Sequence, residues 1–415
     1  MRKTKGKRDA HRAARKPSGA GEILEVHIER ILPGGAGLAH AEGRTILVGL
    51  AAPGDHLRVR LEQARGNVSF AKIVEILTPS PVRVLPPCPY FGRCGGCDFQ
   101  QLSYEAQLAA KVEIIRDCLR RIARIEPPGD IPITPSPLNW RYRSRAQWQY
   151  DPITHSLGYF ERGSHKVCDV LECPVLVPAL QETLLDLRAR LKEGSLPAEV
   201  REFQSVAGDE GASLLPPLTG GQTREVTRRI AGENYRFNAA GFFQINHELL
   251  APLVNAALTD AHGEMAHGAT AVDLYCGAGL FTLPLARRFT RVTGVEASAH
   301  AVAYARRNLS DAGLTNASVH SATVSSWLKE HGPALAPVDY LLLDPPRTGA
   351  EEGAIAGILL SRPQRIAYVS CDPATLARDL KQLLSGGYHL DTITAFDMFP
   401  QTHHVETVTH LAVLL

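Results

Sequence analysis

The sequence predicts a multidomain α/β protein, with a small β-barrel first, an α+β segment in the middle and a doubly wound α/β domain at the end. Three observations support this. The length of 415 residues corresponds to two or three domains of about 150 residues each. Short β-rich runs separated by glycine turns fill residues 21–79. From about residue 265, strand-like runs alternate with helix-like runs, which is typical of a mainly parallel sheet.

Composition and charge narrow the class of protein. The chain is 44% hydrophobic and 21% charged, and its apolar runs stay short of the about 18 residues of a membrane span. The N-terminus lacks the apolar core of a secretory signal, so we expect a cytoplasmic protein whose eight cysteines are reduced or metal-bound. The basic residues concentrate in the first 16 positions, and we predict a disordered basic tail over residues 1–20. That tail either binds phosphate or merely solubilises the chain.

The next segment, residues 21–79, is predicted to form the barrel. Strands are expected at 25–31, 45–48, 56–61 and 69–76, separated by turns at residues 33–35 and 53–55. Strands this short and evenly spaced predict a small closed barrel. With its glycine-rich first turn and its A-P-G-D segment at 52–55, this stretch resembles a TRAM domain, an RNA-binding barrel of the OB type.

A cysteine cluster opens the central segment, residues 80–240. Cys88, Cys94 and Cys97 have the spacing C-x5-C-x2-C, and the glycines among them leave the backbone free to wrap around a metal centre. A fourth ligand is needed, and both Cys168 and Cys173 lie further along the chain. Four thiolates suit either a [4Fe–4S] cluster or zinc, and the spacing does not distinguish them.

Secondary structure in the central segment is predicted as follows. Ser103 is a helix N-cap, and one apolar stripe of the following helix is formed by Leu108, Val112, Ile115, Leu119 and Ile122, with Cys118 beside it. Prolines at 127–137 end this element. Residues 140–150 form a strand with Arg141, Arg143 and Arg145 on one face, suited to phosphate contacts or simply solvated. A helix and then strands follow to residue 240.

The C-terminal domain, residues 241–415, opens its sheet with a glycine-rich turn at Asp273–Gly279. Thr282 replaces the third glycine of a dinucleotide-binding turn, and Glu296 closes the next strand, where an acid can hold both hydroxyls of a ribose. Without the third glycine and a phosphate clamp, S-adenosylmethionine is favoured over NAD. A remnant of a nucleotide site is the alternative interpretation.

Three further positions lie at strand ends of this domain. Asp344 begins an Asp-Pro-Pro-Arg segment, and Arg347 in its fourth position argues against an adenine-N6 enzyme. Cys371 ends the next strand and precedes a helix, whose amide dipoles would lower the thiol pKa; the alternative is a small core residue. Glu406 precedes the last strand and is either a general base or a solvated acid.

Together these segments resemble the uracil-C5 RNA methyltransferase family, closest to its iron–sulfur members that act on 23S ribosomal RNA. The stretches that carry the resemblance are residues 241–246, 273–279, 344–347, 370–379 and 397–406. The resemblance implies a Rossmann-like class I methyltransferase domain in which Cys371 is the nucleophile and Glu406 the general base. It also implies two binding sets: Gln244, Tyr275, Glu296 and Asp344 for S-adenosylmethionine, and Cys88, Cys94, Cys97 and Cys173 for a [4Fe–4S] cluster. Some relatives carry asparagine in place of Leu280.

The expected function is therefore methylation of uridine C5 in RNA, most specifically in 23S ribosomal RNA, by a monomer without a membrane partner. A tRNA enzyme of the same family is the alternative substrate class. The alternative from another functional class is a non-catalytic RNA-binding iron–sulfur protein, which would show no turnover. A radical methylthiotransferase would need a C-x3-C-x2-C triad, which the C-x5-C-x2-C spacing does not match.

Overall fold

The computed structural model describes residues 21–127, 129–218, 221–260, 263–332, 335 and 337–414. The predicted basic tail lies outside these residues. The described residues divide into two compact units, the first built from residues 21–31 and 36–83, the second from residues 32–35 and the described residues after 83. Within the described residues, every helix is too short or too polar to cross a membrane.

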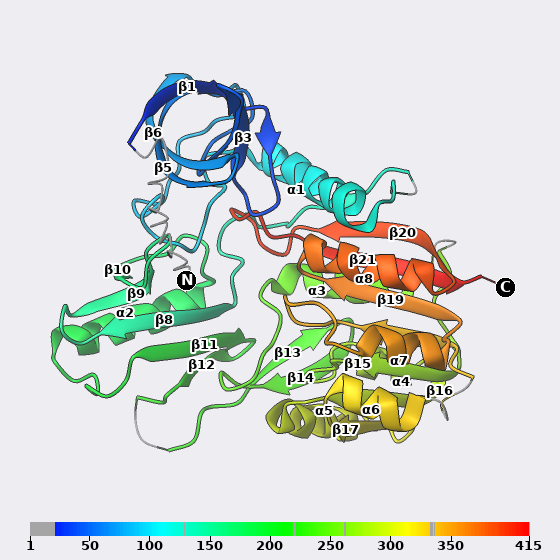
Figure 1. Ribbon diagram of the computed structural model, residues 1–415. Helices are drawn as coiled ribbons and strands as arrows, with labels where there is room; N and C mark the ends of the chain where they lie inside the picture. Colours follow the sequence, from blue (N-terminus) through cyan, green and yellow to red (C-terminus); the bar gives the residue numbers. More distant parts are fainter. Residues whose placement is uncertain are drawn as a thin grey trace, which may run out of the picture. The chain divides into compact units, whose positions relative to one another are not determined.

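The first unit is a six-stranded antiparallel and parallel sheet that curls into a ring (Figure 1). Its strands pair in the order β1-β5-β6-β4-β3-β2, and their bounds are β1 (Ile23–His27), β2 (Arg30–Ile31), β3 (Gly37–Ala41), β4 (Arg44–Val48), β5 (His56–Arg65) and β6 (Val68–Thr78). Buried aliphatic side chains, among them Ile46, Leu57 and Val59, fill its core. Strand β3 was not predicted from the sequence. Asp55 fixes the turn before β5, since its buried carboxylate accepts the backbone N–H of Ala52 at 2.7 Å.

The second unit begins its regular structure with helix α1 (Tyr104–Cys118), followed by a short π-helical turn (Leu119–Ala123). The predicted N-cap is confirmed, because the Ser103 hydroxyl accepts the backbone N–H of Ala106 at 3.3 Å. The predicted apolar stripe is confirmed in part: Ile115 and Leu119 are buried and Val112 packs against the same core, whereas Ile122 is exposed. The residues of α1 that are buried include Gln107 and Lys111 as well as Ile114, Ile115 and Cys118. A face that buries a lysine and a glutamine is not visible to a search for apolar periodicity.

A five-stranded sheet with one covering helix follows. Its order is β10-β9-β8-β11-β12, with β8 (Arg145–Asp151), β9 (Ser156–Phe160), β10 (Val167–Asp169), β11 (Glu202–Gly208) and β12 (Gly211–Leu215). Helix α2 (Pro178–Lys192) packs four buried leucines, spaced three and four residues apart, against this sheet. A hairpin of β13 (Val226–Ile230) and β14 (Glu233–Phe237) leads toward the last domain.

The predicted arginine face before β8 is wrong. Strand β8 begins only at Arg145, and Arg141 adopts a left-handed conformation with φ of 54°. Arg143 lines a cavity, and Arg145 lies over the Phe242 ring and donates to Gln204 at 3.1 Å. Arg143 and Arg145 therefore take part in separate contacts and do not share one basic face.

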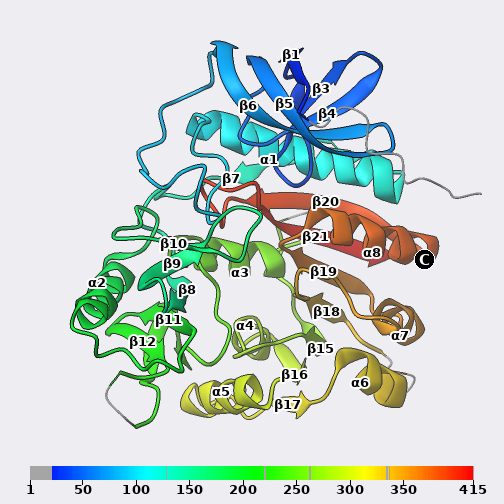
Figure 2. The same cartoon turned by 60° about the vertical axis from the view of Figure 1, so that its left-hand side comes forward.

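The largest sheet has eight strands in the order β17-β16-β15-β18-β19-β21-β20-β7 (Figure 2). Strands β15 to β19 are parallel, whereas β21 runs antiparallel to its neighbours β19 and β20. The strand bounds are β7 (Ile133–Thr134), β15 (Gly268–Leu274), β16 (Phe289–Glu296), β17 (Ala317–Ser321), β18 (Tyr340–Leu343), β19 (Arg365–Ser370), β20 (Tyr388–Phe396) and β21 (Glu406–Val413).

Helices cover this sheet and divide its packing into two cores. They are η2 (His247–Leu249), α3 (Leu250–Leu258), α4 (Thr282–Ala286), α5 (Ala299–Asp311), α6 (Val324–His331), α7 (Ala354–Ser361) and α8 (Pro373–Ser385). One core joins α3, α4 and α5, and the other joins α6, α7 and α8. The end of α1 contributes Ile115 and Cys118 to the second core, and β7 pairs with β20. Residues 104–134 thus pack with the C-terminal sheet although they precede it by more than a hundred positions.

Candidate active site

The register of the large sheet brings the predicted site residues to one edge. Leu274 of β15 pairs with Val295 of β16 and with Leu343 of β18. The next residues of those strands, Tyr275, Glu296 and Asp344, therefore follow at the same carboxyl edge, where open α/β sheets bind ligands. Further along the sheet, Ser370 pairs with Thr407. Continuing that antiparallel register by one residue places Cys371 opposite Glu406.

The glycine-rich turn after β15 closes against β16. Gly277 and Gly279 have φ of 54° and 93°, a conformation that glycine adopts without strain. The Glu296 carboxylate accepts the backbone N–H of Gly277 at 3.1 Å and that of Ser298 at 2.7 Å. This carboxylate is half-buried beside the turn, so it can exchange these contacts for ribose hydroxyls. Tyr275 lies in the same turn and its hydroxyl accepts the backbone N–H of Glu351 at 3.1 Å.

One acidic residue in this turn escaped the sequence analysis as a site residue. Asp273, the penultimate residue of β15, is fully buried, and the Thr282 hydroxyl donates to its Oδ2 at 2.5 Å. Burial, with smaller contributions from the Asp344 and Glu296 carboxyls, raises the pKa of Asp273 to about 8 against the lowering effect of the Thr282 hydrogen bond. In the described part of the chain its Oδ1 has no hydrogen-bond partner. The sequence did contain a signal for Asp273. Thr282 stands where a dinucleotide-binding turn has its third glycine, and its hydroxyl bonds to Asp273.

Gln244 and Asp344 meet although a hundred residues separate them. Gln244 is buried, and its amide donates to Asp344 Oδ2 at 3.3 Å. The loop that carries Gln244 is held by Ser144, whose hydroxyl donates to the Ile245 carbonyl at 2.8 Å. Burial raises the pKa of Asp344 to about 7, against the lowering effect of the hydrogen bond from Gln244. The pKa of Asp344 is therefore held above that of an exposed carboxyl group.

Cys371 and Glu406 lie in a low-dielectric part of the same edge. Glu406 is 1% exposed, and burial together with the Asp344 carboxyl raises its pKa well above the usual range, while Arg347 lowers it. Its Oε1 has no hydrogen-bond partner among the described residues. An unpartnered oxygen in a buried carboxyl group is costly unless a ligand uses it. This atom therefore retains unused hydrogen-bonding capacity at the sheet edge.

The expectation that helix dipoles lower the thiol pKa of Cys371 is wrong for this structure. Burial raises that pKa, and the Glu406 and Asp344 carboxyls raise it further, whereas Arg347 lowers it. The first amides of α8 are occupied by Asp372, whose carboxylate accepts the N–H groups of Ala374 and Thr375 at 3.0 and 2.8 Å. Desolvation and like charge therefore outweigh the dipole at the thiol.

The four cysteines that the family resemblance assigned to a metal centre line one cavity. Cys88, Cys94, Cys97 and Cys173 are free thiols, and Arg143 reaches the same cavity with its Nε unpartnered among the described residues. Burial raises the pKa of Cys94 to about 11 and of Cys97 to about 12, while Arg143 lowers that of Cys97. Four soft donors facing one cavity beside a cation suit an anionic thiolate centre.

The remaining cysteines are separate from that cavity. Cys168 is fully buried and accepts a hydrogen bond from Arg93 Nε at 3.2 Å, so it does not line the cavity, whereas Cys173 does. Cys118 and Cys276 are buried in the cores of the large sheet. In the described residues, no three histidine, cysteine or acidic side chains are arranged closely enough to hold a metal ion. The four thiols line the same cavity, but in the described residues they are not arranged closely enough to ligate a metal ion.

Comparison with known families gives two matches. Residues 223–413 match the family model described as tRNA (Uracil-5-)-methyltransferase, and residues 17–74 match the TRAM domain. The second match agrees with the curled sheet of the first unit, and the first covers the sheet edge described above.

Individual relatives are similar over nearly the whole chain. The 23S rRNA (uracil(1939)-C(5))-methyltransferase RlmD of Methylococcus capsulatus is 34% identical, covering 96% of this chain and 98% of that protein. An uncharacterized RNA methyltransferase of Thermosynechococcus vestitus is 33% identical over 94% of this chain and 98% of its own length. Among solved structures, the tRNA (uracil-54, C5)-methyltransferase of Pyrococcus abyssi in complex with S-adenosyl-L-homocysteine is similar with a TM-score of 0.70 and 26% identity, covering 93% of this chain and all of that one.

Proposed function

The chain belongs to the uracil-C5 RNA methyltransferase family with an N-terminal TRAM domain, and from that premise we propose that its substrate is a uridine of 23S ribosomal RNA. It is an S-adenosylmethionine-dependent RNA (uracil-C5)-methyltransferase. The observation that carries the choice of RNA is the similarity to enzymes named for 23S rRNA over 92% or more of each protein's length.

A tRNA is the second candidate substrate, because the similar Pyrococcus abyssi structure is named for uracil-54 of tRNA. The test is methyl transfer from labelled S-adenosylmethionine to purified 23S rRNA and to the tRNA pool of a strain that lacks this gene. We expect 5-methyluridine at one 23S position, absent in the deletion strain and restored by the gene. Restoration of a tRNA methylation instead would contradict the proposed substrate.

Uracil C5 is too weak a nucleophile to take a methyl group directly, and we assign its activation to Cys371. Addition of the Cys371 thiolate to C6 forms a C–S bond and moves the electrons of the C5–C6 double bond into an enolate, which makes C5 nucleophilic. Bound S-adenosylmethionine supplies the electrophilic methyl group that C5 takes up. Burial raises the pKa of this thiol, and Arg347 opposes that shift and so favours the thiolate that adds to C6.

After methylation C5 carries both a methyl group and its original hydrogen, and we assign removal of that hydrogen to Glu406. Its carboxylate takes the proton, the C5–H electrons restore the C5–C6 double bond, and the C6–S bond breaks to return the Cys371 thiolate. The register that places Cys371 opposite Glu406 supports this pairing. The unpartnered Oε1 of Glu406 supplies the acceptor atom.

The cofactor residues are assigned on the same edge. Glu296 would hold the ribose hydroxyls, and Tyr275, Gln244 and Asp344 would line the remaining part of the cofactor site. The buried Asp273, with one oxygen unpartnered, fits a ligand with hydrogen-bond donors or positive charge, as the methionine part of S-adenosylmethionine provides. The target base must leave its stack to reach this edge.

The coupled carboxyl groups predict a pH effect. Glu406 must be ionised to accept the C5 proton, and its raised pKa keeps it protonated at low pH, so turnover should rise with pH through the titration of the Asp344 and Glu406 pair. Asp344→Asn removes the like charge, so Glu406 should ionise more easily. The acid limb of the pH–rate profile, where turnover rises with pH, should therefore move to lower pH by about one unit or more.

The measurement for that prediction is the rate of product release in single turnover with saturating RNA and cofactor, followed from acid to neutral pH. Asp339→Asn is the matched control, because Asp339 caps the opposite end of β15 by accepting the N–H of Thr270 at 2.9 Å. An acid limb that stays in place, or moves to higher pH, in Asp344→Asn would contradict the coupling.

We further propose that Cys88, Cys94, Cys97 and Cys173 hold a [4Fe–4S] cluster in a central domain of residues 80–240. The shared cavity and the neighbouring Arg143 cation support this donor set. A cluster bound there would cross-link the long segment between β6 and α1. No step of the methylation requires it.

The ligand set is tested by two single substitutions. Cys173→Ser should strongly reduce bound iron and the absorbance at about 400 nm in protein purified without oxygen, since one of four thiolates is lost. Cys168→Ser should retain both, because Cys168 lies outside the cavity. Zinc in place of iron would contradict the cluster, and the reverse pattern of the two variants would contradict the ligand assignment.

A further inference from the structure

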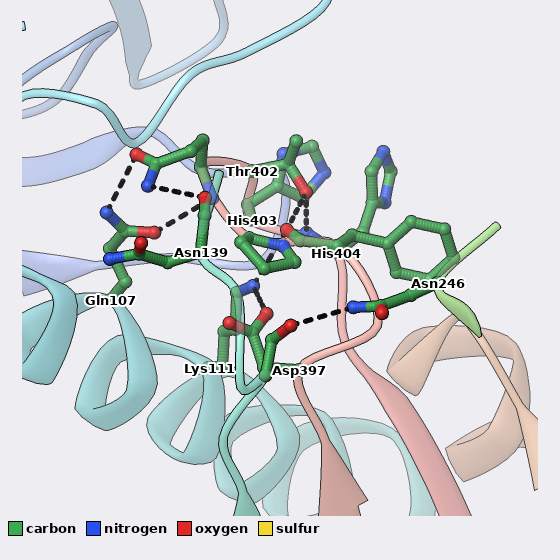
Figure 3. A network of polar contacts seen from close by, with 12 residues as sticks. Gln107, Lys111, Asn139, Asn246, Asp397, Thr402, His403 and His404 are labelled. Carbon is green, nitrogen blue, oxygen red and sulfur yellow. Dashed lines mark hydrogen bonds and ion pairs between the residues drawn. The ribbon is translucent and has the colours of Figure 1, made fainter. Parts of the chain in front are cut away.

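The loop between β20 and β21, residues 397–405, ends directly at Glu406, and its anchors come from one part of the chain. These anchors lie between Asp98, which immediately follows Cys97, and Tyr142. Figure 3 shows Gln107, Lys111 and Asn139 beside this loop. The base proposed for the reaction and the proposed ligands of the cysteine cavity are thus joined by a short series of contacts.

The first contact involves Asp98, the residue after Cys97. The backbone N–H of His403 donates to Asp98 Oδ1 at 2.9 Å, and the ring Nδ1 of His403 lies within hydrogen-bond distance of Oδ2. In the opposite direction, the N–H groups of Asp98 and Phe99 donate to the Gln401 carbonyl at 3.1 and 3.0 Å. Gln401 and His403 of the loop are therefore bonded to the two residues that follow the cysteine triad.

The second set of contacts comes from α1. The backbone N–H of Gln401 donates to Gln107 Oε1 at 2.9 Å, and Gln107 Nε2 donates back to Gln401 Oε1 at 3.1 Å. The fully buried Lys111 ammonium pairs with Asp397 and donates to the Phe399 carbonyl at 3.0 Å. Separating such a buried pair leaves an uncompensated charge, so these partners hold the start of the loop firmly. Asp98 then fixes the part of the loop nearest Glu406.

The position of Asp98 depends in turn on the cysteine segment. Between the end of β6 at Thr78 and the start of α1 at Tyr104, the described chain contains isolated bridges but no helix or strand. A loop of this length inside a compact unit needs other bonds to hold it in one conformation. Ligation of Cys97 would fix the residue next to Asp98.

We propose that Asp98 is a positioning residue that holds the loop before Glu406 against the segment that carries the cysteine triad. This rests on the proposed roles of Glu406 and of the cysteines. Because the Asp98 contacts lie on the loop of the base and not on the strand that carries Cys371, loss of Asp98 impairs removal of the C5 proton more than formation of the C6–S bond.

The experiment compares Asp98→Ala and Asp98→Asn with wild type as full-length proteins of equal iron content and equal absorbance. In single turnover, Asp98→Ala should release the covalent RNA adduct about 10- to 100-fold more slowly, with adduct formation changed less than about threefold. Asp98→Asn should be intermediate, because its side-chain oxygen still accepts the His403 N–H. Independently of activity, hydrogen exchange of the amides of residues 401–406 should become faster in Asp98→Ala.

Asp169→Asn is the matched control, because Asp169 also accepts a backbone N–H, from Leu157 at 2.9 Å, and pairs with a cation, Arg188, without contacting the loop. Wild-type exchange and wild-type adduct release in Asp98→Ala would overturn the proposal. Equal slowing of both steps, with a lowered melting temperature and unchanged exchange at 401–406, would also overturn it. A wild-type protein that methylates no RNA would contradict the proposed function, and hydrogen exchange would still decide the role of Asp98.

Discussion

Replacing Cys371 with alanine is expected to abolish methylation of RNA while leaving binding of S-adenosylmethionine intact. The thiol is the group that turns C5 into a nucleophile, and the residues around it offer carboxyl groups in place of a second nucleophile. Loss of a covalent nucleophile costs on the order of 10⁴-fold or more in turnover. The cofactor residues Tyr275, which follows β15, and Glu296, which ends β16, lie two and three strands away from β19, so cofactor affinity should change little.

The measurements are methyl transfer to RNA under single-turnover conditions and calorimetric titration with S-adenosylmethionine. Cys118→Ala is the matched control, since Cys118 is also a free, buried thiol that packs in the core of the same sheet. It should retain activity within a few-fold. Substantial turnover in Cys371→Ala would exclude the covalent mechanism.

Replacing Glu406 with glutamine is expected to trap the reaction after methyl transfer. Glutamine has nearly the same shape but cannot accept the C5 proton, so the C6–S bond cannot break by restoring the double bond. General-base removal is worth about 10²- to 10⁴-fold, and adduct release should slow by a similar factor. A covalent complex of protein and methylated RNA should therefore accumulate and be visible by denaturing electrophoresis.

Accumulation of the complex should require both the cofactor and Cys371, and the double variant Cys371→Ala, Glu406→Gln should show none. Glu233→Gln is a suitable control, because Glu233 pairs with Arg287 on the surface of the same unit. A Glu406→Gln protein that turns over like wild type, or that stalls before methyl transfer, would assign proton removal to another group.

The sequence predicted those parts of the molecule whose determinants are local. The N-cap at Ser103, the strands of the C-terminal sheet up to β19 and the position of Cys371 at a strand end follow from capping, hydrophobic runs and turn residues near one another in the chain. The general base could be placed before a last strand, but its partner could not. Only the antiparallel pairing of β21 with β19 puts Glu406 opposite Cys371.

The parts that sequence reasoning missed depend on long-range polar contacts. The buried face of α1 carries Gln107 and Lys111 because their partners, Gln401 and Asp397, lie almost three hundred residues away. An apolar-periodicity search counts such residues as solvent-exposed. The Cys371 pKa was mispredicted for a related reason, since the local helix dipole was visible in the sequence while the carboxyl groups of Asp344 and Glu406 were not.

The covalent mechanism at Cys371 is tested most directly with RNA that carries 5-fluorouridine at the target position. Fluorine at C5 cannot be removed as a proton, so after methyl transfer the C6–S bond cannot be released and the wild-type enzyme should stop as a stable complex. Peptide mass spectrometry of that complex should locate a nucleotide with both a methyl group and fluorine on Cys371. Attachment at another residue, or no attachment by an enzyme that methylates ordinary RNA, would contradict the account.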